Sequence, residues 1–239
     1  MKQSATLGGR IASQSLSAKT FLGLVLLMLS GKIVWTFADV DHPLVQQWTA
    51  SWTAIIVVGV LGILVYYGVS KRVDFPQIWD EGVSNKQRLL LPALLGLAVA
   101  AIEIVISLLQ HLPKDIHVPL PCSIPVYLTG GIFLELLYHF IPILLLMWVV
   151  SGLVLKDRYQ NRVFLISAIL LALWEPAMQL VGMLSMGMLT SLVFAIFLLV
   201  FIFIANIIPL ALFRRYGFLA PVVFRLADYL LWHIIFPAI

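Results

Sequence analysis

The stretch Leu189–Phe213 reads LTSLVFAIFLLVFIFIANIIPLALF and contains no charged side chain. A helix needs about 20 consecutive apolar residues to cross the hydrocarbon core of a bilayer, and this stretch is long enough to do so. Strands of a membrane barrel alternate apolar and polar side chains over about ten residues, and this run does not alternate. The stretch therefore predicts a transmembrane helix.

Six further stretches have the same length and apolar character: Thr20–Ala38, Trp48–Ser70, Leu89–Gln110, Pro125–Leu155, Val163–Met183 and Phe218–Pro237. The long stretch that begins at Pro125 contains Pro142, which can kink or divide a helix, so a count of eight helices stays open beside seven. Only 11% of the residues are charged, against roughly 25% in a soluble domain. The sequence predicts an all-α, polytopic transmembrane helix bundle, with residues 1–239 forming one integral membrane domain in a lipid bilayer.

Basic residues predict how this bundle is oriented. Alternate connections carry nearly all of them: Lys2, Arg10, Lys19, Lys71, Arg72, Lys86, Arg88, Lys156, Arg158, Arg162, Arg214 and Arg215. The other connections contain only Lys114. By the positive-inside rule, we expect a multi-pass protein of the cell membrane with a cytoplasmic N-terminus and a C-terminus outside.

Four smaller features exclude other classes of protein or narrow the interpretation of the sequence. The single cysteine, Cys122, excludes an intrachain disulfide framework and a multi-cysteine metal site. No clear small-residue cleavage site follows the apolar run Thr20–Leu29, so we expect a retained first helix rather than a signal peptide. The basic excess reports orientation, and no nucleic-acid partner is expected. His111 and His117 fall in an outer connection, where solvated side chains are expected.

Eight ionisable side chains lie inside the predicted spans: Lys32, Glu103, Glu135, His139, Glu175, Arg225, Asp228 and His233. An unpaired charge at the bilayer centre costs at least a few kcal/mol, so such groups usually face the bundle interior, pair, and mark functional sites. At about 1.5 Å per residue, Glu135, Glu175 and Arg225 fall near the middle of a core about 30 Å thick. Lys32 and Glu103 lie at depths similar to each other, which predicts an ion pair between the first and third helices.

Spacing along the helices adds to depth. Glu135 and His139 are four residues apart and share one helical face. A second stripe at the same spacing lies on the last span: Arg225, Tyr229 and His233. We therefore expect one buried polar site formed by four side chains: Glu135, His139, Glu175 and Arg225. A carboxylate and an imidazole can bind a metal, or can hold a water and take its proton, and the residues leave open whether a metal takes part. Structural pairing of helices without chemistry is the alternative.

The part from Pro125 to Ile239 also resembles a known family, the CAAX-protease and bacteriocin-processing (CPBP, or Abi) family of intramembrane proteases. That family's first motif, Glu-Glu-x-x-x-Arg, aligns with LELLYH at 134–139. Its second, Phe-x-x-x-His, aligns with LALWE at 171–175. Its third, His-x-x-x-Asn, follows a turn that ends in Ala-Pro. Here the turn reads GFLAP at 217–221 and the helix continues as RLADY at 225–229.

The resemblance implies an intramembrane endopeptidase in which a glutamate activates the water that attacks a membrane-embedded peptide. Only Glu135 matches the family in kind, so the role of general base carries over to it alone. The positions of the family's Arg and of its two His are taken by His139, Glu175 and Arg225. Our hypothesis is that His139 and Glu175 hold the water or a metal, while Arg225 stabilises charge. Two alternatives stay open: a non-catalytic protein that binds a ligand or partner in this cavity, and a proton-coupled transporter, which the lack of an internal repeat disfavours.

Overall fold

The computed structural model describes residues 7–37, 51–112, 116–185 and 191–239, with side chains described from residue 13 onward. These residues form helices and no strand. Seven of their helical spans are long and apolar enough to cross a membrane: Ser13–Phe37, Trp52–Arg72, Lys86–Gln110, Ser123–Val154, Gln160–Ser185, Leu192–Tyr216 and Leu219–Ala238. The all-α, multi-pass membrane class that the sequence predicts is therefore confirmed.

The spans are built from α-helices and from wider π-helical turns. The α-helices are α1 (Leu7–Phe37), α3 (Trp52–Gly68), α4 (Leu91–Gln110), α5 (Ser123–Leu134), α6 (Ile141–Leu146), α7 (Gln160–Ser185), α8 (Leu192–Tyr216), α9 (Leu219–Tyr229) and α10 (Phe236–Ala238). The π-helical turns are η2 (Lys86–Leu90), η4 (Glu135–Phe140), η5 (Met147–Val154) and η6 (Leu230–Ile235), and a 3₁₀ turn, η1 (Ser70–Arg72), follows α3.

The fourth span answers the question of seven or eight helices within the described residues. Ser123–Val154 runs without a break through α5, η4, α6 and η5, so Pro142 does not divide it. Pro142 stands in the first turn of α6, directly after η4, where the wider π-helical winding accommodates a residue that has no N–H to donate. Three predicted span ends lie outside the described residues: Ala38, Trp48 and Leu189.

Local sequence signals set several helix ends. Ser51 caps α3 by accepting from the backbone N–H of Ala54 at 3.1 Å. Ser191 caps α8 by accepting from Phe194 N–H at the same distance. These hydroxyls satisfy donors that a helix start otherwise leaves free. The turn after α8 depends on Gly217, which has a φ of +82° and leaves no space for a side chain, because an added Cβ would lie 2.6 Å from a backbone oxygen.

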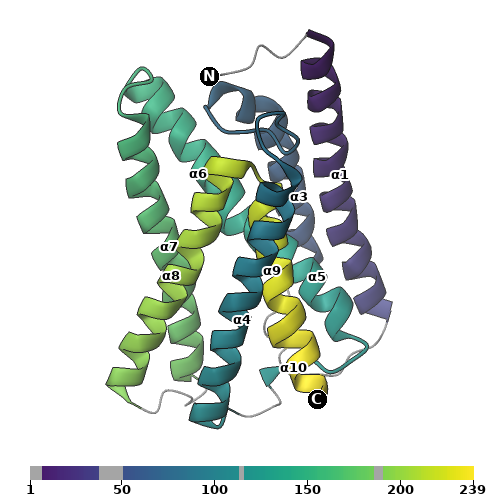
Figure 1. Ribbon diagram of the computed structural model, residues 1–239, viewed down its shortest axis with the longest axis vertical. Helices are drawn as coiled ribbons and strands as arrows, with labels where there is room; N and C mark the ends of the chain where they lie inside the picture. Colours follow the sequence, from purple (N-terminus) through teal and green to yellow (C-terminus); the bar gives the residue numbers. More distant parts are fainter. Residues whose placement is uncertain (1–6, 38–50, 113–115, 186–190) are drawn as a thin grey trace.

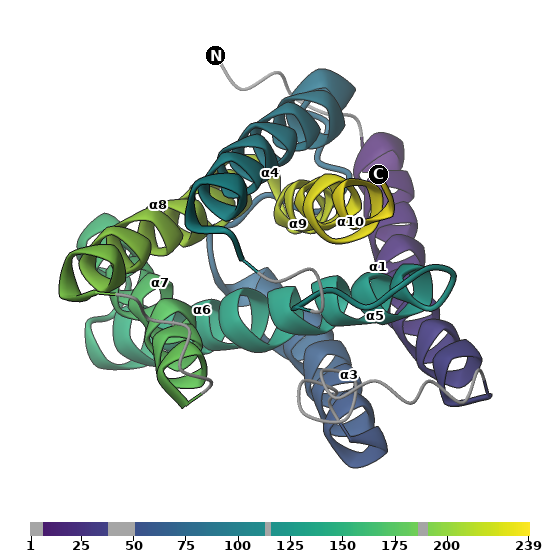
Figure 2. The same cartoon turned by 90° about the horizontal axis from the view of Figure 1, so that it is seen from below.

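The last span is an inner helix of the bundle. In Figure 1 α1 begins at the top and the chain ends at the bottom, as an odd number of crossings requires. In Figure 2 the yellow α9 lies between α4, α5 and α1, and α3 and α7 lie further out. α9 packs against α4, α8 and α5. Because neighbours cover several of its faces, α9 can carry charged side chains that are shielded from the membrane.

Close packing holds α9 in this position. An added Cβ on Gly96 of α4 would lie 2.2 Å from the carbonyl oxygen of Phe224, so α4 and α9 touch backbone to backbone. Small residues allow such approaches in membrane helices. Four buried aromatic rings also pack together near the start of α9. They come from α1, η4, α8 and the residue before α9: Phe21, Phe140, Phe213 and Phe218. The cluster anchors η4 and the start of α9 relative to each other.

The predicted ion pair between Lys32 and Glu103 is wrong. The Lys32 ammonium lies 3.7 Å from the ring centroid of Trp35, and Glu103 faces Asp228 on α9 instead. Figure 2 shows α9 between α4, which carries Glu103, and α1, which carries Lys32. Equal depth was a poor guide because it does not say which side of the bundle a residue faces. An indole ring can also hold an ammonium group without a carboxylate.

Candidate functional site

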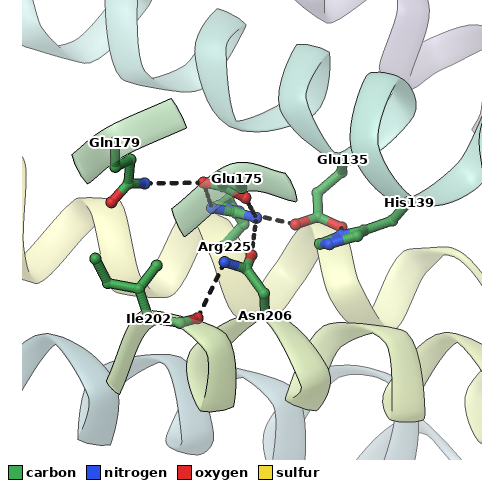
Figure 3. A network of polar contacts seen from close by, with 7 residues as sticks. All are labelled: Glu135, His139, Glu175, Gln179, Ile202, Asn206 and Arg225. Carbon is green, nitrogen blue, oxygen red and sulfur yellow. Dashed lines mark hydrogen bonds and ion pairs between the residues drawn. The ribbon is translucent and has the colours of Figure 1, made fainter. Parts of the chain in front are cut away.

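The bundle centre holds one guanidinium group shared between two carboxylates (Figure 3). Arg225 of α9 donates from Nε to Glu135 Oε1 at 2.8 Å. Its Nη1 and Nη2 donate to Glu175 Oε1 and Oε2 at 2.8 and 2.9 Å, a strong bidentate arrangement. Nη2 also donates to Asn206 Oδ1 at 3.2 Å. All four residues are buried, so this network, which we call the Arg225 network, joins η4, α7, α8 and α9 out of contact with solvent.

His139 extends the Arg225 network on the side of Glu135. Its Nδ1 lies 2.8 Å from Glu135 Oε2, and both side chains are fully buried. A carboxylate accepts only, so Nδ1 carries the proton and donates it. Both residues belong to η4, the π-helical turn, and such turns are frequent at functional sites. Nε2 of His139 has no hydrogen-bond partner among the described residues.

Most donor and acceptor atoms of the Arg225 network already form hydrogen bonds, and a few do not. A guanidinium has five N–H groups, and four of those on Arg225 donate to Glu135, Glu175 and Asn206, which leaves one N–H on Nη1; Tyr229 of the same helix also lies close to the guanidinium. Both oxygens of Glu135 accept hydrogen bonds, and so do both oxygens of Glu175. Gln179 adds a further donor to Glu175 at 3.2 Å. The atoms still available in this centre are therefore His139 Nε2 and one N–H of Arg225.

The predicted convergence of four side chains is confirmed: Glu135, His139, Glu175 and Arg225 lie in one connected network. Both carboxylates accept from the same guanidinium, which keeps them within the limit of about 10 Å beyond which a shared site is impossible. Sequence reasoning missed Asn206. Its signal was available, because it is the one amide in the middle of the apolar stretch Leu189–Phe213.

The arrangement differs from the predicted one in one respect. His139 and Glu175 stand on opposite sides of the guanidinium in Figure 3, so they do not face a common water or metal. In the part of the chain that the structure describes, no group of three or more His, Cys, Asp or Glu side chains is placed to hold a metal ion. A guanidinium between the two carboxylates also takes the position that a cation would need.

His233, the last member of the predicted stripe, lies outside the Arg225 network. Its Nδ1 contacts Nδ1 of His117 at 3.1 Å, and its ring stacks on Tyr127 with centroids 4.3 Å apart. The expectation that His117 is solvated is wrong, since it is 4% exposed. Burial lowers the pKa of His117 to about 4, so this imidazole is neutral at physiological pH.

Comparison of the chain with protein-family models, with curated proteins and with solved structures finds no match in any of the three. The function of this centre therefore has to be argued from its own geometry.

Proposed function

We propose that this chain is an intramembrane hydrolase, a divergent endopeptidase of the kind that its resemblance to the CPBP family implies, and that it cleaves a membrane-embedded peptide. The observation that carries the proposal is the buried pair of Glu135 and His139, in which Nε2 of the imidazole has no hydrogen-bond partner among the described residues. A basic atom and an unused cationic donor in one buried site are what hydrolysis of an amide requires.

The geometry favours a revised division of roles. The family resemblance implies Glu135 as the general base, but both of its oxygens already accept hydrogen bonds. His139 Nε2 is the basic atom without a partner. We therefore assign the general base to His139. Glu135 holds the Nδ1–H tautomer and stabilises the imidazolium that forms, as the carboxylate does in a Ser-His-Asp triad.

The proposed reaction proceeds in two proton transfers. Nε2 of His139 takes a proton from a water molecule while the water oxygen attacks the peptide carbonyl carbon. The oxygen of that carbonyl gains negative charge, and the unused N–H of Arg225 stabilises it. The imidazolium then returns the proton to the peptide nitrogen as the C–N bond breaks. Burial strengthens each of these electrostatic interactions, because no bulk water screens them.

A membrane-peptide library incubated with the purified full-length protein in lipid nanodiscs tests the proposal, with products identified by mass spectrometry. We expect cleavage by the wild type and a loss of about 10²-fold or more in His139→Gln and Glu135→Gln. Exposed residues provide matched controls, since His111→Gln and Glu81→Gln make the same chemical changes away from the site. Cleavage that persists in both site variants contradicts the mechanism.

One observation favours a second candidate, a non-catalytic protein that binds a ligand or partner at this centre. Arg225 occupies oxygens on both Glu135 and Glu175, and such a closed network also serves to lock helices together. In that case a library peptide raises the unfolding temperature of the protein in nanodiscs but yields no product. Peptide binding that is weakened in His139→Gln but not in His111→Gln, without turnover by the wild type, replaces the first candidate by the second.

We further propose that the N-terminus is cytoplasmic and that the C-terminus lies outside the cell membrane. Basic residues support this, because η1 and the last turn of α8, which carry Lys71, Arg72, Arg214 and Arg215, lie near the end of the bundle at which α1 begins. Arg214 and Asp74 lie 3.9 Å apart there, which links these two regions. Reporter fusions at both termini test the orientation, and a periplasmic or extracellular N-terminal reporter contradicts it.

A further inference from the structure

A second polar centre lies where α4 meets α9, separate from the Arg225 network. The carboxyl group of Glu103 on α4 lies against that of Asp228 on α9. Asp228 is 7% exposed. The backbone contact at Gly96 draws the two helices together and brings the acids into reach of each other. We call these two residues the acid pair.

The acid pair lacks the donors that the Arg225 network has. Among the described residues, no hydrogen-bond donor reaches Glu103 Oε2 or Asp228 Oδ1, and both atoms are buried. Two ionised carboxylates accept only, so they cannot hydrogen-bond to each other without a proton between them. Like charges in contact inside a low-dielectric bundle also repel strongly.

The charged surroundings do not remove this repulsion. The groups that act on Asp228 from its own helix and from the packed helices are Arg225, Tyr229, Glu103 and Glu175. Arg225 is the one cation among them, and its guanidinium is already shared between two other carboxylates. With every carboxyl group ionised, four negative charges would therefore surround a single guanidinium.

We propose that Glu103 and Asp228 form a proton-binding site inside the membrane, in which the two carboxyl groups hold one proton between them at neutral pH. The proton comes from water, and it forms an O–H bond on one carboxyl group and a hydrogen bond to the other. The two residues share this proton, so its binding and release belong to the pair and not to either residue alone. This site is distinct from the proposed hydrolase centre, and its test does not depend on peptide cleavage.

A proton suits the acid pair better than a metal cation does. Sodium, calcium and magnesium need several oxygen ligands, and calcium takes about six to eight. In the described part of the chain, no third His, Cys, Asp or Glu joins the two acids in a group that could hold a metal. Arg225, one helical turn away on α9, also repels a metal cation. A proton needs only the two oxygens that are already in contact.

Release of the proton has a consequence for the Arg225 network. Two negative carboxylates then stand one helical turn from a guanidinium that keeps one unused N–H. Asp228 competes with Glu135 and Glu175 for that cation. Occupancy of the acid pair is therefore coupled electrostatically to the geometry of the Arg225 network, as in proton-linked membrane proteins.

Infrared spectroscopy of the full-length protein in nanodiscs tests the proposal directly. We expect the carbonyl band of a protonated carboxyl group at about pH 7, where ordinary Asp and Glu side chains are ionised. In Glu103→Gln the amide donates to Asp228 without a titratable proton, so the band is lost. Asp228→Asn gives the converse variant, and Glu81→Gln, at an exposed position, should keep the band. A band that survives in both acid-pair variants, or its absence in the wild type, overturns the proposal.

Unfolding in detergent mixtures supplies a second measurement. The folded pair keeps one proton that the unfolded chain releases above its ordinary pKa values, so stability falls as pH rises. For one proton, the folding equilibrium weakens by about tenfold per pH unit in this range. We expect this slope in the wild type and in Glu81→Gln, and its loss in Glu103→Gln. Equal slopes in the wild type and Glu103→Gln contradict the proposal.

A sodium titration at fixed pH separates a proton from a metal cation. Sodium chloride is compared with choline chloride at equal ionic strength, with unfolding as the measurement. We expect the two salts to act alike on the wild type. If sodium alone stabilises the wild type, and this stabilisation is lost in both Glu103→Gln and Asp228→Asn, the site binds a metal cation and the proposal of a proton-binding site is overturned.

Discussion

Arg225 and Asp228 stand one helical turn apart on α9, and the two centres to which they belong bury carboxyl groups in opposite ways. In the Arg225 network each carboxylate oxygen accepts a hydrogen bond, because one guanidinium, one imidazole and the Gln179 amide supply five hydrogen bonds to two carboxylates. In the acid pair the two carboxyl groups face each other, and no donor from the described residues reaches Glu103 Oε2 or Asp228 Oδ1. A membrane helix can therefore carry an acid either by matching it to a cation or by keeping a proton on it.

The largest effect is expected from removing the cation. Arg225→Met takes away the three guanidinium hydrogen bonds to Glu135 and Glu175 and leaves two buried carboxylates without their shared cation. Breaking a buried pair in this way costs about 3–5 kcal/mol. Unfolding of the purified protein in detergent mixtures measures the loss. The loss of stability in Arg225→Lys should fall between zero and that of Arg225→Met, because an ammonium group keeps the charge but cannot reproduce the planar, bidentate geometry of the guanidinium. A loss below about 1 kcal/mol in Arg225→Met would mean that both carboxylates find protons or water instead.

A second experiment separates the two centres by moving one helix. In Gly96→Ala the new Cβ would lie 2.2 Å from Phe224 O, so α4 has to shift away from α9, which carries Asp228. We expect a loss of about 1–3 kcal/mol, as for other overpacked sites. Gly130→Ala is the matched control, since nothing lies within 4 Å of its Cβ. The infrared band of the acid pair should weaken in Gly96→Ala and persist in Gly130→Ala. Equal stability of the two variants would contradict the close contact of α4 with α9.

A third experiment uses the pH dependence of a buried imidazole near the other end of α9. Burial lowers the pKa of His117 to about 4 from 6.5. The unfolded chain then binds a proton that the folded chain does not, so stability is lost as pH falls from about 6.5 to about 4. This sign is opposite to that of the acid pair. The effect is absent at neutral pH and becomes visible only as an acid-side slope in unfolding. His117→Gln should flatten the slope and His111→Gln should keep it; an unchanged slope in His117→Gln removes His117 as its cause.

The smallest effect is expected at Lys32, a buried side chain that forms no ion pair with any carboxylate of the described residues. Its ammonium group lies over Trp35, and a cation–π contact contributes about 0.5–2 kcal/mol, which the cost of keeping a cation out of water offsets in part. Lys32→Met should therefore cost about 1 kcal/mol or less in the unfolding experiment. The loss should be the same in a Glu103→Gln background, because the two residues do not pair. A clear dependence of one substitution on the other would restore the ion pair that the structure excludes.

Much of the fold could be predicted from hydropathy because the bilayer imposes it. Seven apolar stretches longer than the hydrocarbon core leave few arrangements other than a helix bundle. The continuity of the fourth span was harder to predict. Pro142 is accommodated by the π-helical turn before it, and no residue type in η4 predicts that turn from the sequence. Of the candidate site, Glu135, Glu175 and Arg225 were predictable, since each is an ionisable side chain at mid-depth in an apolar span.

The sequence by itself determined the class of this protein, the depth of each ionisable group and the gathering of four polar residues at one level. Depth can be counted along a helix, since each residue advances it by about 1.5 Å. Only the tertiary structure decided which groups pair. Lys32 and Glu103 have similar depths yet face different neighbours, because pairing depends on the rotation of each helix about its axis and on which helix packs beside it. Those two quantities come from side-chain packing between segments far apart in the chain, as at Gly96, where a missing Cβ lets α9 approach and brings Asp228 to Glu103.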